Sequence, residues 1–320
     1  MKKFISAILA IALLTFAGSA LSACANEKPV IGIIQFGSHA SLNNCYTGII
    51  EGLKETVDLS EYKIEYLNSN FDPAVSFTQA QKLVNSRAKV IIAIATPSAI
   101  QAATAAVGTG IPTVYCAVTD ATQLENFADL TGTSDIPDFD AQLKLVTGFM
   151  GKGNLKIGIL SSTEESSDAA QISAIRKAAE AYEGMEIIVE TVADISTIDV
   201  KTEALIAAGI DCMVNLLDNT VVGRLQNILV KTNAANVPVF GSEIEQVRAG
   251  CLASASIDYI TVGKLSGRQA AEILAGKPVG EVERKTMENQ TYPYYNSNVL
   301  SNFSALSIPT GIANLTDVAD

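Results

Sequence analysis

The sequence contains no tryptophan and one histidine, and aromatic residues make up 6% of its 320 residues. So few aromatic rings disfavour a platform on which nucleic-acid bases or long sugars would stack. The sequence also lacks the Walker A pattern, the Gly-x-Gly-x-x-Gly fingerprint and any His, Cys or carboxylate spacing typical of a metal site. We therefore predict that the protein holds no metal and no cofactor.

Positive charge is scarce as well. The chain has 22 Lys and Arg against 34 Asp and Glu, which gives a net charge of −12. Proteins that bind nucleic acid normally present a basic surface, so we expect no nucleic-acid partner. Hydrophobic residues make up 48% of the chain, and its length suits two domains of ordinary size, each with a buried core.

The N-terminal segment has the pattern of an export signal. Lys2 and Lys3 precede an apolar run over residues 4–16, and Leu-Ser-Ala-Cys follows at 21–24. This order is typical of a bacterial lipoprotein signal peptide, residues 1–24, in which Cys24 becomes the lipidated first residue; an ordinary cleaved signal is the alternative. No later stretch reaches the roughly 18 uninterrupted apolar residues of a membrane span. We expect an exported protein, anchored by lipid to the extracytoplasmic face of the cell membrane.

The four other cysteines are Cys45, Cys116, Cys212 and Cys251. None has the spacing of a metal site or of a Cys-x-x-Cys motif. Three of them lie in or beside apolar strand-like runs, where a thiol packs as a small hydrophobic group. The sequence favours unpaired thiols.

Three sequence patterns occur twice in the chain behind this signal. Residues 30–34 are echoed by 156–160, residues 90–98 by 211–220, and residues 111–115 by 237–241. Each is an apolar run that ends in small polar residues, which is typical of a buried parallel strand that opens into a loop. Helical patterns alternate with these strands, so each half should form right-handed βαβ units with a parallel sheet. The sequence predicts an α/β fold of two Rossmann-like lobes.

The tail of the chain does not fit the second half alone. We expect the first lobe to comprise residues 28–120 and 250–285, and the second lobe residues 133–242 and 296–320. The chain then crosses between the lobes three times, near 120–133, 242–250 and 285–296. Such crossings form a hinge, because a few loop residues absorb the rotation of two rigid bodies.

Polar loops that follow the predicted strands hold the candidate site, because ligands of open α/β sheets bind beyond the carboxyl ends of the strands. Hydroxyls and the helix start at Thr96 to Ser98 suit a carboxylate, and the acidic candidates suit an ammonium group. A zwitterion such as an amino acid needs both. The candidate ligand-binding residues are Phe36, Ser38, His39, Thr96, Ser98, Ala99, Thr119, Asp120, Ser162, Glu165, Ser166, Asp218, Asn219, Ser242 and Glu243.

The same residue types are also ordinary helix caps and turn formers, so the convergence of the set matters more than any one member. His39 as a general base would need an orienting partner and a nucleophile, and no spacing indicates either. We therefore predict no catalytic residue and no enzymatic activity.

At these loops the chain resembles the ABC-transporter substrate-binding lipoproteins of the tryptophan/tyrosine-type group, which have the type I periplasmic-binding-protein fold. The resemblance is carried by residues 31–35, 94–99, 117–120, 218–222, 238–243 and 257–259. It implies a binding protein that delivers a small solute, an amino acid, to a membrane permease. Ala121 stands where the family often has Pro, and the loop 37–44 differs from the commoner version. The ligand therefore stays open; an aromatic amino acid would pack on Phe36, His39 or Tyr46.

Other functions remain as alternatives. A nucleoside- or sugar-binding lipoprotein of the same fold is the nearest, although the missing tryptophan argues mildly against it. An exported hydrolase that uses His39 or paired carboxylates, and a sensory ectodomain for a partner kinase, are more distant. We expect a monomer.

Overall fold

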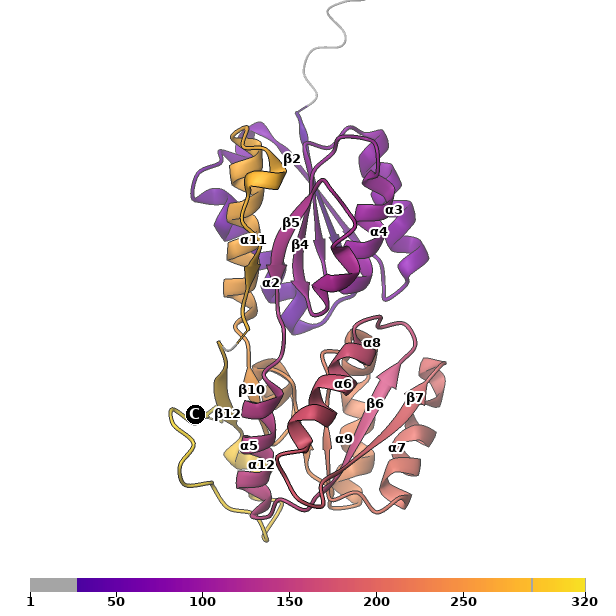
Figure 1. The fold of residues 1–320 in the computed structure, drawn as a ribbon, viewed down its shortest axis with the longest axis vertical. Helices are drawn as coiled ribbons and strands as arrows, with labels where there is room; N and C mark the ends of the chain where they lie inside the picture. Colours follow the sequence, from indigo (N-terminus) through magenta and orange to yellow (C-terminus); the bar gives the residue numbers. More distant parts are fainter. Residues whose placement is uncertain (1–27, 289, 320) are drawn as a thin grey trace, which may run out of the picture.

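The computed structural model describes residues 28–288 and 290–319, which form two lobes joined by three chain crossings (Figure 1). The upper lobe contains a six-stranded sheet in the order β11-β5-β4-β3-β1-β2, and all its pairings are parallel. This confirms the predicted α/β fold with mainly parallel sheets. The strands are β1 (Val30–Gln35), β2 (Lys63–Asn68), β3 (Val90–Ile94), β4 (Thr113–Val118), β5 (Leu130–Ser134) and β11 (Lys285–Thr286).

Helices cover both faces of this sheet, so its central strands are buried on both sides. Along β1, Ile31 and Ile33 pack into one cluster with α2 and α11, while Ile34 packs into another with α3 and α4. This alternation follows from the two-residue period of a strand. The helices are α2 (Ala40–Lys54), α3 (Pro73–Asn85), α4 (Thr96–Ala106) and α11 (Tyr259–Leu274), with short 3₁₀ helices η1 (Leu59–Glu61), η2 (Ala121–Leu124) and η4 (Val279–Glu281).

Glycines allow α2 and α11 to pack with their backbones in contact. A Cβ atom at Gly48 would lie 2.1 Å from the carbonyl oxygen of Ile260, and one at Gly263 would lie 2.1 Å from that of Cys45. Only glycine fits at such a distance. The close pair joins the start of α2, which follows β1, to the start of α11, which follows a chain crossing.

The lower lobe contains a four-stranded parallel sheet in the order β7-β6-β8-β9. Its strands are β6 (Lys156–Ser162), β7 (Glu186–Val192), β8 (Cys212–Val214) and β9 (Val239–Phe240). Its helices are α5 (Phe139–Met150), α6 (Asp168–Ala179), α7 (Ile198–Ala207), α8 (Asn219–Val222), α9 (Leu225–Ala234) and α10 (Ile244–Arg248), with the 3₁₀ helix η3 (Ile195–Thr197).

A small second sheet completes the lower lobe. Its order is β10 (Ala253–Ser256), β12 (Tyr292–Tyr295) and β13 (Thr316–Asp317), and α12 (Ser297–Leu300) lies between the last two in sequence. The β10–β12 pairing is antiparallel and the β12–β13 pairing is parallel.

The chain passes between the lobes at residues 135–138, 257–258 and 287–291. Two of the expected boundaries differ from the structure. β5 belongs to the upper sheet, beyond the expected limit at 120, and β10 belongs to the lower lobe, although residues 250–257 were assigned to the upper one. The pattern of β10 is short and rich in Ala and Ser, and its partner β12 lies about forty residues further along the chain. Local sequence periodicity does not reveal such a pairing.

Cys45, Cys116, Cys212 and Cys251 are free and buried, which confirms the expected unpaired thiols. The expected signal peptide 1–24 and its Cys24 lie outside the described residues. Within residues 28–288 and 290–319, the helices fall short of the length and apolar character needed to cross a membrane.

Candidate ligand-binding site

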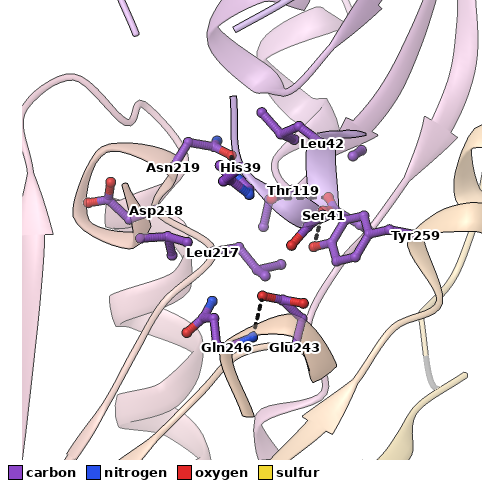
Figure 2. A pocket seen from close by; sticks show the side chains of 13 residues that line it. His39, Ser41, Leu42, Thr119, Leu217, Asp218, Asn219, Glu243, Gln246 and Tyr259 are labelled. Carbon is purple, nitrogen blue, oxygen red and sulfur yellow. Dashed lines mark hydrogen bonds between the residues drawn. The ribbon is translucent and has the colours of Figure 1, made fainter. Parts of the chain in front are cut away.

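A cavity lies between the two lobes, where the carboxyl ends of the strands face each other (Figure 2). Its volume is about 20 Å³, which is room for about one water molecule. Both lobes and one of the chain crossings contribute to its wall. The lining residues are His39, Ser41, Leu42, Ala117, Thr119 and Tyr259 from the upper lobe, Asp135 from the first crossing, and Leu217, Asp218, Asn219, Val222, Glu243 and Gln246 from the lower lobe.

The backbone at the end of β4 is distorted where it meets the cavity. Ala117 has a φ of 56°, and the β4–β5 register shifts between Cys116 and Val118. A bulge of this kind re-aims the chain at a sheet end. Ala95, at the end of the neighbouring β3, has a φ of 79°, in a region that costs a non-glycine residue roughly 1–3 kcal/mol. Two strained residues, Ala95 and Ala117, therefore lie at the edge of the sheet that faces the other lobe.

Asp135 and Glu243 are two of the three buried carboxyl groups that line the cavity. Asp135 accepts hydrogen bonds from the Thr119 hydroxyl at 3.0 Å and the Tyr259 hydroxyl at 2.8 Å. Glu243 accepts from the backbone amides of Glu245 and Gln246 at 2.6 and 3.0 Å, and so caps α10. Burial raises the pKa of Asp135 to about 6 and that of Glu243 to about 7, against the effect of these hydrogen bonds.

No Lys or Arg is found among the described residues that line the cavity. In the part of the chain that the structure describes, no group of three or more His, Cys, Asp or Glu residues could hold a metal ion. The buried carboxyls therefore face the cavity without a cation of the protein's own. A ligand that carries an ammonium group would supply one, because charge-assisted hydrogen bonds to carboxylates are strong.

Asp218 also lines the cavity, but its carboxylate is fully used inside the lower lobe. It accepts hydrogen bonds from the Ser162 amide at 2.7 Å and the Ser162 hydroxyl at 3.1 Å. It also caps α8 by accepting from the amides of Thr220 and Val221 at 2.9 and 3.0 Å. Figure 2 shows this carboxylate turned away from the centre of the cavity. Asp218 therefore fixes the loops that form the wall.

Two further acids lie behind Asp218. Burial, followed by the charge of Asp218, raises the pKa of Glu165 to about 8 and that of Asp168 to about 10. Both are therefore protonated at neutral pH. The lower lobe thus contains a cluster of carboxyl groups whose neutral form is favoured first by burial and then by the charge of neighbouring acids.

A chain of hydrogen bonds runs from this cluster to the upper lobe. Glu165 accepts from the Asn219 side-chain amide at 2.7 Å, and the Asn219 carbonyl oxygen lies 2.9 Å from Nε2 of His39. Burial lowers the pKa of His39, so its ring is neutral. Because the Asn219 oxygen faces Nε2, the neutral ring carries its hydrogen on Nε2 and donates a hydrogen bond to Asn219. The other ring nitrogen, Nδ1, is an unprotonated acceptor, and it has no hydrogen-bond partner within the described residues.

Two more hydrogen bonds join the lobes. The side-chain amide of Asn44 donates to Glu245 at 3.1 Å, and that of Gln123 donates to the carbonyl oxygen of Ser166 at 3.0 Å. The lobes are therefore held together around the small cavity.

The structure brings five of the predicted site residues to the cavity wall: His39, Thr119, Asp218, Asn219 and Glu243. Three others support that wall from behind. Ser162 binds Asp218, Glu165 binds Asn219, and the Ser242 hydroxyl accepts a hydrogen bond from Gln246 at 2.7 Å.

The remaining predicted residues lie outside the lining. Thr96, Ser98 and Ala99 are buried in the first turn of α4, where the Thr96 hydroxyl accepts from the amide of Thr119 at 3.2 Å. Phe36 is a core residue. Ser38 is exposed and Asp120 caps η2. Ser166 contributes its backbone carbonyl to the bond with Gln123.

The most informative residues that the sequence did not indicate are Asp135 and Tyr259. Asp135 lies in the first chain crossing and Tyr259 directly follows the second, and the expected lobe boundaries place both crossings elsewhere. Asp135 directly follows β5, so the rule that sites form at strand ends would have found it if Leu130–Ser134 had been identified as a strand. The cavity is also lined by residues that no sequence pattern indicates: Ser41 and Leu42 at the start of α2, Leu217 in a loop, Val222 at the end of α8 and Gln246 within α10.

Residues 30–302 match the protein family described as ABC transporter substrate binding protein. A tyrosine-binding protein from Clostridioides difficile is 31% identical over 267 residues, which cover 81% of this chain and 76% of that protein. Among solved structures, an ABC domain from Streptococcus pneumonia in complex with L-Trp is 24% identical with a TM-score of 0.82, and covers 91% of this chain and all of its own. The ligand-free, open structure of a substrate binding protein with adhesive properties from Clostridium difficile is 25% identical with a TM-score of 0.66, covering 91% and 99%.

Proposed function

The chain belongs to the family of ABC transporter substrate-binding proteins, and we propose that its solute is an amino acid with an aromatic side chain. The observation that carries this proposal is the interlobe cavity, into which both lobes place hydrogen-bonding groups around the buried carboxyls of Asp135 and Glu243. These two acids suit an ammonium group, and the side-chain amide of Gln246, which donates one of its two N–H groups to Ser242, can offer the other to a carboxylate. The curated relative named for tyrosine binding supports the same class of ligand.

Binding requires the lobes to separate. A cavity of about 20 Å³ has no room for an amino acid, so the ligand enters when the three crossings rotate the lobes apart. The arrangement seen here has a higher TM-score against the complex with L-Trp than against the open structure, at similar sequence identity. This supports the view that the structure represents a closed arrangement. Ligand binding would favour closure onto the ligand, with a larger cavity than the one seen here, because such a form contacts the ligand from both sides.

The protein would act outside the cytoplasm, tethered to the membrane through Cys24, and would pass its ligand to the permease subunits of an importer. The order of charges, apolar run and Cys24 in the N-terminal segment supports this. Replacing Cys24 by Ala should release the protein from the membrane fraction. We expect a radioactive fatty acid to label the wild type but not C24A. Equal labelling of both proteins would refute the lipid anchor.

A thermal-shift screen tests the ligand class directly. The purified protein, lacking its first 24 residues, would be heated with each of the twenty amino acids, common nucleosides and common sugars. We expect stabilisation by one or more aromatic amino acids, because a ligand that binds only the folded state raises its melting temperature. Chromatography should recover the ligand unchanged. Stabilisation only by a sugar or nucleoside would replace the proposed ligand class, and consumption of the ligand would indicate an enzyme.

A further inference from the structure

One loop of the lower lobe, residues 163–167, lies against the upper lobe. Gln123 of η2 donates to the carbonyl oxygen of Ser166, and His39 at the start of α2 donates to Asn219. Figure 2 shows the side chains of His39 and Asn219 meeting between the lobes. Glu165 lies directly behind these contacts, because it accepts from the Asn219 side chain at 2.7 Å and is 4% exposed. One amide group therefore separates the Glu165 carboxyl from the upper lobe.

Glu165 shares this buried space with two other acids, Asp168 and Asp218. Asp218 accepts four hydrogen bonds from its own lobe, so its charged form is the best supported of the three. Asp168 contacts the Asp218 carboxylate, and its Oδ2 atom is buried with no donor among the described residues. Two carboxyl groups in contact are stable only when they share a proton. The geometry of the cluster therefore requires bound protons.

The surroundings of Glu165 supply no cation that would neutralise it. In the described part of the chain, no Lys or Arg forms an ion pair with any of the three acids. The other titratable or charged groups around the loop are His39, Asp120, Glu164 and Arg224. His39 is neutral because burial lowers its pKa, Asp120 accepts from Gln123 at 2.9 Å, and the last two are exposed. An ionised Glu165 would therefore lie close to the charge of Asp218 without compensation.

Closure of the lobes contributes to the burial of Glu165. Burial, followed by the charge of Asp218, raises its pKa to about 8 in the arrangement seen here. When the lobes separate, His39 and Gln123 move away, water reaches Asn219 and the loop, and the pKa of Glu165 falls toward its ordinary value of about 4.3. The bound proton therefore stabilises the closed form fully below the pKa of the open form. This stabilisation is lost as the pH rises through the closed-form value of about 8.

We propose that closure of the two lobes is coupled to the uptake of a proton by Glu165, so that acid favours the closed form and alkali favours the open form. The proposal goes beyond the proposed function, because it needs the lobe rotation described there but not the identity of the solute. A protein outside the cytoplasm meets the pH of its surroundings directly. Its retention of a solute therefore depends on external pH, with release favoured at alkaline pH.

Förster resonance energy transfer between the lobes measures closure without any ligand. Val107 of the upper lobe and Val230 on α9 of the lower lobe are 67% and 68% exposed, so Val107→Cys and Val230→Cys together accept a pair of pH-insensitive dyes. The protein would lack its first 24 residues, and its four other cysteines are buried, which protects them from labelling. The interlobe distance would be followed from pH 6 to pH 9, with circular dichroism to confirm the fold at each pH.

The labelled protein should open as the pH rises. We expect the ratio of closed to open molecules to fall by at least about 10-fold between pH 6 and pH 9, because one proton changes it by at most about 10-fold per pH unit. Glu165→Gln keeps an acceptor for Asn219 and is neutral at every pH, so it should remove most of this change. The difference from the labelled parent isolates Glu165 from Asp135 and Glu243, whose pKa values burial also raises.

Glu164→Gln is the matched control. It removes an acid from the adjacent position in the sequence, but Glu164 is exposed and should leave the pH dependence unchanged. The measurements would be repeated in an Asn44→Ala background, which lacks the interlobe bond to Glu245 and so brings the two forms closer to balance. A shift is then visible even where the parent protein is almost wholly closed.

The possible results separate this proposal from the proposed function. An interlobe distance that stays constant with pH in both backgrounds, or a change that E165Q leaves intact, would overturn proton-coupled closure while solute binding stands. A stability that depends on the Glu165 proton, combined with a constant distance, would also overturn it, because the proton would then be taken up on folding and not on closure. Failure to bind any solute in the thermal-shift screen would overturn the proposed function and leave these distances unaffected.

Discussion

The two lobes share a strand-and-helix plan but contribute opposite chemistry to their interface. In the three hydrogen bonds described above between the lobes, the upper lobe donates, through His39, Asn44 and Gln123, and the lower lobe accepts. The upper lobe has its acids in exposed ion pairs: Lys82 and Lys63 lower the pKa of Glu65, and Arg268 and Lys264 lower that of Glu55 to about 2. The lower lobe also has ion pairs at its surface, such as Lys152 with Asp211, but in addition it buries three acids with raised pKa values, Glu165, Asp168 and Glu243, at or behind the cavity wall.

This difference indicates how each lobe is specialised. The upper lobe is held by close steric packing, of which the glycine contact between α2 and α11 is the tightest part. The lower lobe holds its site loops with a network of carboxyl groups that need protons or hydrogen-bond donors. Steric changes should therefore damage the upper lobe most, and changes of charge or pH should act on the lower lobe.

The largest expected effect tests the close packing of α2 against α11 in the upper lobe. In Gly263→Ala the new Cβ would lie 2.1 Å from the carbonyl oxygen of Cys45, so the α2–α11 pair must move apart. We expect the free energy of unfolding to fall by about 3 kcal/mol. Gly280→Ala is the matched control, because a Cβ there meets no atom within 4 Å. Urea unfolding of both variants measures the difference, and an equal stability of the two would contradict close packing.

A second substitution tests the lower lobe's hydrogen-bond network. Asp218→Ala removes the cap of α8 and both bonds to Ser162, so we expect a loss of about 2 to 3 kcal/mol of stability and of most ligand binding. In Asp218→Asn the Oδ1 atom still accepts from Ser162, Thr220 and Val221, whereas the bond from the Ser162 amide is lost and the contact with the Asp168 carboxyl group changes. Asparagine should therefore retain much of the stability. If alanine and asparagine are equally harmful, the charge of Asp218 matters more than its hydrogen bonds.

Most of the architecture could be predicted from the sequence, because it depends on local patterns. The apolar runs that became β1, β3, β6 and β8 alternate with helical segments, and that alternation dictates parallel sheets in two lobes. The placement of β10 could not be predicted, because a four-residue strand of Ala and Ser is defined only by its distant partner β12.

The site was predictable to the extent that it follows strand ends. His39, Asn219 and Glu243 lie at the cavity for that reason, whereas Asp135 and Tyr259 depend on the correct chain crossings. The role of Asp218 could not be predicted either. Its carboxylate could point to the ligand or to the loop at Ser162, and only the three-dimensional arrangement decides between them.

The pH dependence of stability tests whether buried acids of the lower lobe are protonated in the folded protein. Burial, followed by the charge of Asp218, raises the pKa of Glu165 to about 8 in the folded protein, against about 4.3 when unfolded. The folded state therefore binds more protons than the unfolded state between these values, and stability falls as the pH rises through this window. The slope for one such group is at most about 1.4 kcal/mol per pH unit.

Glu165→Gln should flatten this slope, because glutamine is neutral at every pH. Unfolding of the wild type and of E165Q in urea at pH 5, 6, 7 and 8 makes the comparison. Glu272→Gln, at an exposed acid on α11 that pairs with Lys277, is the control and should leave the slope unchanged. A wild-type stability that rises with pH over this range would refute buried, protonated acids in the lower lobe.

The smallest expected effect concerns the hydrogen bonds between the lobes, in which the upper lobe donates and the lower lobe accepts. Asn44→Ala removes one interlobe donor while the cavity lining stays intact, so it disfavours closure and should weaken every ligand by the same factor, about 2- to 5-fold, which corresponds to a partly exposed hydrogen bond. Gln226→Ala removes an exposed bond within the lower lobe, to the carbonyl oxygen of Ala249, and should leave affinity unchanged. Calorimetric titration gives the affinities, and small-angle scattering shows whether N44A is more extended. If N44A binds ligands as tightly as the wild type does, the Asn44–Glu245 bond does not contribute to closure, and the complementarity of the lobes would reside in the cavity residues alone.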